Sequence, residues 1–393
     1  MYLIEWMLWH VQTSRYESEG WQDKLEKHLA LSRAGKLKHE DELPGIHDRA
    51  SENPNADGSL YDFNETYIEV MAGGSEARRG VITFISLMVL YAVYKQTSMT
   101  VLLNTVWFTG VYYSGGDPAT TTDYAVAIFM AALTAGLYYV VIRYVRIIIN
   151  LENFVQRRLL IRFNRVTRQV YLHRPRFAGG ITVLDWEQVT PQSVVGQAEA
   201  ENIGRQVLLL WDPAVTGLPH LHLVFVGKTA DGTSDLVNLW EFIRRYMEEG
   251  PQSVPAPKKL VGKVPWPWQS VMASLSFFRP LWRAGLRWQV ACWVALTSPA
   301  LLLHSAGHWV SLLLCWEPRW PRIIREAGLP GKPVPPLSTA ADWPPLPEKS
   351  KPRPARKPRS TRPEPIEPVP QRAAHHPSEP TSGSSPNTQQ DVL

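Results

Sequence analysis

Two pairs of histidines have spacings that come closest to a metal site. His220 and His222 alternate along a segment expected to be a strand, so their imidazoles point to the same face. His304 and His308 are four residues apart in an apolar segment, on one side of an expected helix. Zinc sites use such spacings but need a third protein ligand, and neither pair has one nearby in the sequence. We therefore predict surface histidines for the first pair, neutral interfacial histidines for the second, and no metal, cofactor or catalytic residue.

Other recurrent catalytic motifs are absent from the sequence. It contains no phosphate-binding Gly-rich loop, no GxSxG turn, no HExxH helix and no cysteine cluster. Cys292 and Cys315 lie in apolar surroundings without the spacing of a zinc site, so we predict two buried thiols. These absences favour a binding protein over an enzyme.

Basic side chains form the second group with chemical meaning. Several arginines follow the second of two long apolar segments, where each contributes about 1 kcal/mol of attraction to anionic lipid if it lies near the membrane surface. A solvated strand face is an equally good interpretation of them. The residues that we predict to contact lipid or a protein partner are Arg157, Arg158, Arg162, Arg165, Trp240, Arg244 and Arg245.

The two apolar segments predict a membrane hairpin at residues 78–146. Residues 124–142 carry no charge, and about 20 such residues are enough for a helix to cross the hydrocarbon. The first segment, about 81–97, contains Lys95 and then continues as 99–113, so its register stays open. The loop between the segments lacks Lys and Arg, whereas both flanks have them, which places the N-terminus and the main soluble part in the cytoplasm.

Residues 155–250 carry the pattern of a small antiparallel sheet closed by one C-terminal helix. Residues 234–249 have helical apolar spacing, with Ser234 as the expected N-cap. Residues 1–77 have a loosely ordered pattern with a possible helix at 20–32. Near their end we expect a strand at 61–71 that pairs with this sheet. The α+β order resembles a pleckstrin-homology-like (PH-like) outline, an analogy that defines no ligand. The other expected strands are 159–163, 170–172, 181–189, 205–211 and 220–227.

The remaining chain divides into a membrane-associated region, 251–329, and a tail. Its third apolar stretch, 290–316, contains no Asp, Glu, Lys or Arg but is interrupted by Pro299. A single crossing there would place the basic tail outside, so we favour an in-plane or re-entrant arrangement over a transmembrane helix, and the sequence leaves both open. Residues 330–393 are rich in proline and charge, and we predict disorder for them.

Composition agrees with a membrane protein that does not bind nucleic acid. The chain of 393 residues has room for more than one folding unit. Its formal net charge is only +5, and much of the basic excess lies beside the apolar segments or in the tail. This distribution favours an anionic membrane face as the partner.

Several stretches resemble a family of uncharacterised proteobacterial membrane proteins that share a domain of unknown function. The resemblance covers roughly residues 61–330. Members look to be associated with type VI secretion effector loci, which implies an accessory or immunity protein in the bacterial inner membrane. No functional residue is carried over. The resembling stretches are the double span, RFNRVTRQVYLHR at 162–174, LDWEQV at 184–189, LWEFIRRYMEEG at 239–250 and WEPRWPRII at 316–324.

Three hypotheses of function follow. The preferred one is a non-enzymatic protein that holds a toxic effector or a secretion component at the membrane. The first alternative is a lipid-responsive, membrane-anchored module that uses the arginines after the second span. The second is a membrane enzyme acting on lipid or cell-wall precursors, which would require the histidines.

Overall fold

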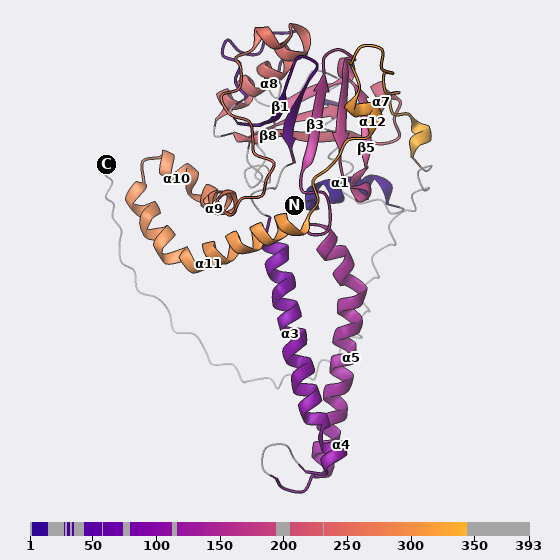
Figure 1. The fold of residues 1–393 in the computed structure, drawn as a ribbon, viewed down its shortest axis with the longest axis vertical. Helices are drawn as coiled ribbons and strands as arrows, with labels where there is room; N and C mark the ends of the chain where they lie inside the picture. The colour runs from indigo at the N-terminus through magenta and orange to yellow at the C-terminus, as the bar shows by residue number, and fades with distance from the viewer. Residues whose placement is uncertain are drawn as a thin grey trace, which may run out of the picture. The chain divides into compact units, whose positions relative to one another are not determined.

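The computed structural model describes residues 2–14, 27, 30, 31, 34, 43–56, 58–73, 79–111, 116–193, 205–230 and 232–343. Within them, a curled antiparallel sheet lies at one end of a pair of long helices (Figure 1). The helix expected at 20–32 and the tail from 344 onward lie mostly or wholly outside the described residues.

The sheet has the strand order β5–β4–β3–β2–β8–β7–β6, and β1 pairs with β2. All its pairings are antiparallel. Strands β2–β5 and β6–β8 form two meanders, which join where Ala72 pairs with Val226. The strands are β1 (Leu60–Phe63), β2 (Tyr67–Ala72), β3 (Leu159–Asn164), β4 (Gln169–His173), β5 (Ile181–Asp185), β6 (Thr190–Ser193), β7 (Arg205–Trp211) and β8 (His222–Ala230).

The predicted sheet is confirmed, but the strand expected at 61–71 is two strands joined by a tight turn. The Asn64 side chain makes this turn, because its Oδ1 accepts hydrogen bonds of 2.9 Å from the backbone N–H groups of Thr66 and Tyr67. As expected, β2 pairs with the sheet, and its partner is β3. The long helices therefore lie in the connection between two adjacent strands.

Each face of the sheet has its own hydrophobic cluster. Helix α8 (Thr233–Glu248) packs its apolar side over one face, where the Trp240 and Trp186 rings lie 5.7 Å apart. Its N-cap is Gly232 rather than the expected Ser234. The other face is covered by Trp320, which precedes α12 (Arg322–Arg325), and by Ile324 within that helix.

Two further segments complete the sheet domain. Helix α1 (Leu3–Thr13) packs beside β8, and the buried Tyr2 before it donates a 2.8 Å hydrogen bond to the carbonyl of Gln156. Residues 330–343, predicted as the start of a disordered tail, follow the sheet edge, where the N–H of Ser338 donates to the carbonyl of Val183 on β5. A short helix, α7 (Pro213–Thr216), precedes β8.

In the part of the chain that the structure describes, three helical segments are long and apolar enough to cross a membrane by length and composition: 81–109, 121–144 and 287–314. The first consists of α3 (Val81–Asn104) and α4 (Val106–Thr109), and the second lies in α5 (Thr121–Asn150). A polar seam joins α3 to α5. The hydroxyls of Thr100 and Thr134 lie 2.7 Å apart, and Asn104 donates to the carbonyl of Ala127 at 3.2 Å. Such interhelical hydrogen bonds hold helices together in lipid.

The third segment belongs to a helical arm, which we define as residues 264–314. It contains α9 (Pro267–Leu275), α10 (Arg279–Arg283) and α11 (Arg287–Leu314). Helix α9 packs against α11, and Ser270 contacts Nδ1 of His308 at 2.9 Å. In Figure 1, α11 runs across the sheet-proximal end of α3 instead of beside it.

Candidate functional site

The junction between the sheet domain and the long helices is built around Arg79. This side chain is fully buried and precedes α3. Its guanidinium donates to the carbonyl of Arg157 at 2.6 Å, to Oγ of Ser311 at 2.8 Å and to Sγ of Cys315 at 2.9 Å. One arginine thus joins the start of α3, the segment before β3 and the end of α11.

Glu152, just after α5, supplies the negative charge of the junction. Its buried carboxylate accepts hydrogen bonds of 2.6 Å from the backbone N–H of Gly80 and from Oγ1 of Thr83. These donors belong to the first turn of α3, where a carboxylate complements the positive end of the helix dipole. Because both charged groups are enclosed by partners, the junction acts as a structural clamp. Sequence analysis counted Arg79 only among the basic residues that flank the first apolar segment and did not single out Glu152.

Three of the predicted contact residues lie in β3 or directly before it. Arg157 donates to the carbonyls of Leu312 and Cys315, each at 2.9 Å. Arg158 donates to the carbonyl of Lys263, and its guanidinium lies 4.8 Å from the centre of the Tyr61 ring.

Arg162, within β3, is fixed by an ion pair and by two aromatic rings. It is buried and forms a 2.7 Å ion pair with Glu69, while the Tyr67 and Trp320 rings lie 3.8 and 5.1 Å from its guanidinium. Burial raises the pKa of Glu69, but the charge and hydrogen bonds of Arg162 outweigh it, so the pKa lies below its ordinary value. This ion pair is a core interaction.

The other four predicted residues lie on or beside α8. Arg165 donates to the carbonyl of Glu65 at 3.0 Å, and the buried Trp240 donates to the carbonyl of Pro44 at 2.8 Å. Arg244 and Arg245 both donate to the carboxylate of buried Glu241. Each of the seven predicted residues therefore has a partner within the chain, and the seven do not form one patch. Their contact with lipid or a partner stays a prediction.

The prediction of surface positions for His220 and His222 is wrong. Both are buried, because Trp9 of α1 and Trp343, which are distant in sequence, pack against their rings. Nδ1 of His222 lies 2.8 Å from the guanidinium of Arg174. Burial, and then the charge of Arg174, lower the pKa of His222 well below its ordinary value, so it is neutral. Among the described residues, no group of three or more His, Cys, Asp or Glu side chains is placed to hold a metal ion.

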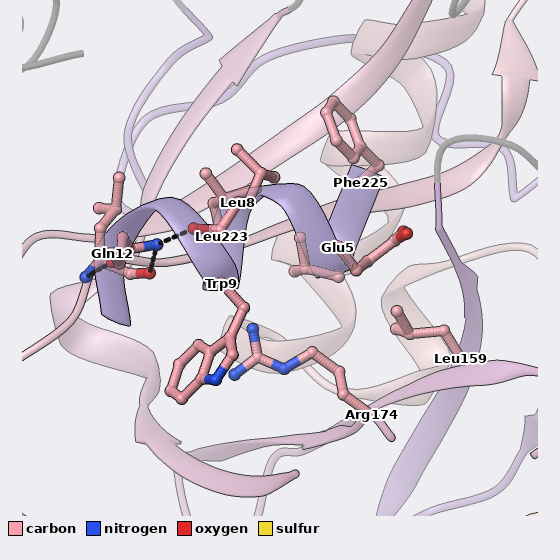
Figure 2. A pocket seen from close by; sticks show the side chains of 10 residues that line it. Glu5, Leu8, Trp9, Gln12, Leu159, Arg174, Leu223 and Phe225 are labelled. Atoms are coloured by element: carbon pink, nitrogen blue, oxygen red, sulfur yellow. Dashed lines mark hydrogen bonds between the residues drawn. The ribbon is translucent and has the colours of Figure 1, made fainter. Parts of the chain in front are cut away.

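A small cavity lies between α1 and β8, beside Arg174. Figure 2 shows the guanidinium of Arg174 beside the Trp9 ring, with Glu5 on the same helix as Trp9. Nε of Arg174 is buried without a hydrogen-bond partner, and burial lowers the pKa of this residue to about 10. The cavity volume is about 20 Å³, which accommodates a water molecule but no substrate.

The two cysteines differ in environment. Cys315 is buried at the junction, as predicted, whereas Cys292 is exposed on α11. The prediction for Cys292 is wrong because its apolar neighbours form an outer helix face instead of a protein core.

A family model matches residues 138–329, and it describes a family of unknown function (DUF6708). The match begins within α5 and includes β3–β8, α8 and the arm. No curated protein and no solved structure matches the chain. The comparison therefore agrees with an uncharacterised domain and contains no information on activity, organism or secretion.

Proposed function

We propose that this protein is a non-enzymatic binding protein anchored in the bacterial inner membrane by a two-span hairpin, with its sheet domain in the cytoplasm. The observation that carries the proposal is the insertion of the hairpin between adjacent strands β2 and β3. Arg79 and Glu152 clamp both ends of that insertion. A binding domain attached in this way is held at the membrane surface without a flexible linker.

The polar seam supports one register of the hairpin in the bilayer. Because Thr100 lies opposite Thr134, Arg143 of α5 lies level with about residue 91 of α3, at 1.5 Å per residue on both helices. The uncharged stretch from Tyr124 to Ile142 is about 28 Å long, close to the hydrocarbon thickness. The corresponding part of the first segment is then about 91–109. This is the register that we propose for the first span, which the sequence left open.

Lys95 fits this register although it lies inside the span. It is about one turn from the cytoplasmic boundary, and side chains on α3 lean toward the N-terminal end of the helix, which is the cytoplasmic end. A lysine there can extend its ammonium group to the headgroups while its methylene groups stay in lipid. The alternative register, with residues 81–100 in the hydrocarbon, would bury Arg143 and Arg146 as well as Lys95. Each arginine near the centre of the span would cost about 2.5–3.5 kcal/mol.

Aromatic side chains at both proposed boundaries support the same assignment. At the outer end, the Trp107 and Tyr124 rings lie 4.8 Å apart. Tyrosine and tryptophan accumulate at membrane interfaces because their rings are amphipathic. The tyrosines near the cytoplasmic boundary are Tyr91, Tyr94, Tyr138, Tyr139 and Tyr144.

The sheet domain provides the proposed binding module. Two antiparallel meanders closed by one C-terminal helix support the PH-like outline as a fold-level analogy. A binding role is supported by the ion pairs that occupy the buried arginines and by a cavity that fits only water. As the partner we propose a toxic effector or a secretion component of a type VI system, the class that the family resemblance implies.

Co-purification from native membranes tests this function. The tagged full chain is extracted in mild detergent, and proteins that accompany it are identified by mass spectrometry. Val166→Arg and Val215→Arg provide matched variants, because both residues are more than half exposed on the sheet domain and distant in sequence. We expect a stoichiometric secreted toxin or secretion component that one of these substitutions removes. Recovery of the protein alone, or with lipid only, would contradict the proposal.

A further inference from the structure

The surface of the arm combines exposed tryptophans with positive charge. From 251 to 316 the sequence contains six Lys and Arg residues and no Asp or Glu. Lys258 and Lys259 are exposed just before the arm, and Arg287 is exposed within it. Exposed tryptophans, aliphatic side chains and cations in one segment are typical of segments that lie at an anionic membrane interface. The large exposed apolar side chains of the arm include Trp266, Trp268, Trp282, Trp288, Trp293 and Leu296.

Both ends of the arm are attached on the sheet side of the hairpin. At its start, the indole N–H of Trp309 donates to the carbonyl of Pro265 at 3.1 Å. At its end, the guanidinium of Arg157 donates a 2.9 Å hydrogen bond to the carbonyl of Leu312. The backbone approach is also close, since a Cβ on Gly307 would lie 2.8 Å from the carbonyl oxygen of Gly80 at the start of α3. The arm therefore leaves the sheet domain and returns to it.

This attachment opposes a crossing by α11, despite its length and apolar composition. If α11 crossed, the turn before it, with Arg279 and Arg287, would have to reach the far side. The outgoing limb, α9 and α10, would also have to cross. That limb spans residues 267–283, is interrupted by a 3-10 turn at Ser276–Phe278, and is about 25 Å long, shorter than the hydrocarbon. A broken helix facing lipid would leave backbone groups without partners.

The first turns of α3 indicate where the arm lies. Val81, Ile85 and Met88 are about half exposed, and they lie on the cytoplasmic side of the boundary at residue 91. An apolar stretch in this position requires an interfacial environment rather than open water. The arm, which packs against the start of α3, lies beside it.

We propose that the arm does not cross the bilayer but lies on its cytoplasmic side in the headgroup region, with its exposed tryptophans inserted toward the acyl chains and its cations on anionic lipid headgroups. This inference rests on the proposed two-span anchorage. It assigns the arm as a lipid-binding surface that sets the height of the sheet domain above the membrane.

Depth-dependent quenching tests the proposal on the full chain. A fluorescent maleimide is attached to Leu302→Cys, an exposed position midway along α11, in a Cys292→Ser background. Leu133→Cys, exposed midway between Asp123 and Arg143 on α5, serves as the matched control. Both proteins are reconstituted in phosphatidylcholine vesicles with and without phosphatidylglycerol. Doxyl lipids with the quencher near the carbonyls or near the methyl ends report depth.

We expect Leu302→Cys to be quenched more by the shallow doxyl lipid and Leu133→Cys more by the deep one. The shallow quenching of Leu302→Cys should increase when phosphatidylglycerol is present. Equal depth at the two positions would overturn the in-plane arrangement, and absence of quenching at Leu302→Cys by either lipid would overturn membrane contact by the arm. Unchanged quenching on addition of phosphatidylglycerol would overturn the preference for anionic lipid. Shallow quenching at Leu133→Cys would instead overturn the hairpin register on which the inference rests.

A second measurement is independent of the fluorophore at Leu302. In intact and permeabilised cells, and in the Cys292→Ser background, a membrane-impermeant maleimide should label Ala284→Cys, at the turn before α11, from the same side as Val166→Cys on the sheet domain. Labelling of these two positions from opposite sides would show that α11 crosses and would overturn the proposal.

Discussion

Replacement of Gly307 by alanine tests the contact that sets the position of the arm. A Cβ at Gly307 would lie 2.8 Å from the carbonyl oxygen of Gly80, and a Cβ at Gly80 would lie 2.4 Å from the backbone nitrogen of His308. The atoms on both sides are backbone, so no side chain can rotate away. Gly136 in α5 provides the matched control, because a Cβ there would meet nothing within 4 Å.

The two substitutions should differ in their effect on stability. Alanine in place of glycine within a helix stabilises it by about 0.8–1.0 kcal/mol, and this gain is common to both sites. Only Gly307→Ala adds overpacking, which costs about 1–3 kcal/mol. We therefore expect Gly307→Ala to be less stable than Gly136→Ala by roughly 1–3 kcal/mol.

The comparison can be made by unfolding both purified proteins in mixed detergent micelles and following tryptophan fluorescence. If Gly307→Ala unfolds at the same denaturant concentration as Gly136→Ala, or at a higher one, the close approach of α11 to α3 does not exist as described. A parallel decrease for both variants would point to a general effect of substitution in apolar helices and would also contradict the reasoning.

Three further predictions concern the sheet domain and the cysteines. Glu69→Gln leaves the buried guanidinium of Arg162 without its carboxylate and should lower the free energy of unfolding by about 3–5 kcal/mol, whereas a loss below about 1 kcal/mol in a chemical denaturation would refute the buried pair. Burial raises the pKa of Glu241, but arginine and backbone hydrogen bonds lower it further, from 4.5 to about 2, so its stabilisation is complete above pH 4.5 and is lost as pH falls toward 2. Glu241→Gln should reduce this pH dependence in thermal unfolding, and an unchanged slope would contradict the assignment. Maleimide should modify Cys292 in the native protein and Cys315 only after denaturation, as counted by intact mass, and modification of both at equal rates would be inconsistent with the burial described.

Local patterns in the sequence predicted the elements that depend on neighbouring residues. Strands such as 205–211 alternate or cluster β-branched and aromatic residues, and the apolar spacing of 234–249 identifies α8. The turn at Asn64 was missed because the residues on both sides have strand propensity. An Asn followed by backbone donors two and three residues later is nevertheless a recognisable turn signal.

Contacts between distant segments could not be predicted in the same way. His222 is buried because Trp9 and Trp343 cover it from opposite ends of the chain. Arg162 has a basic, solvent-facing pattern in sequence, yet Glu69 on the neighbouring strand makes it a core residue. The sequence alone does not reveal such pairings, because the register between β2 and β3 is set across the whole inserted hairpin.

The central claim, that the hairpin anchors a cytoplasmic sheet domain, is tested most directly by cysteine accessibility on its two sides. Asp117→Cys lies in the loop between α4 and α5, and Val166→Cys lies in the turn between β3 and β4; both are exposed. In a Cys292→Ser background, a membrane-impermeant maleimide is added to intact bacterial cells with a permeable outer membrane. We predict labelling of Asp117→Cys at once and of Val166→Cys only after the inner membrane is opened. Labelling of both positions before opening, or of Val166→Cys alone, would contradict the account.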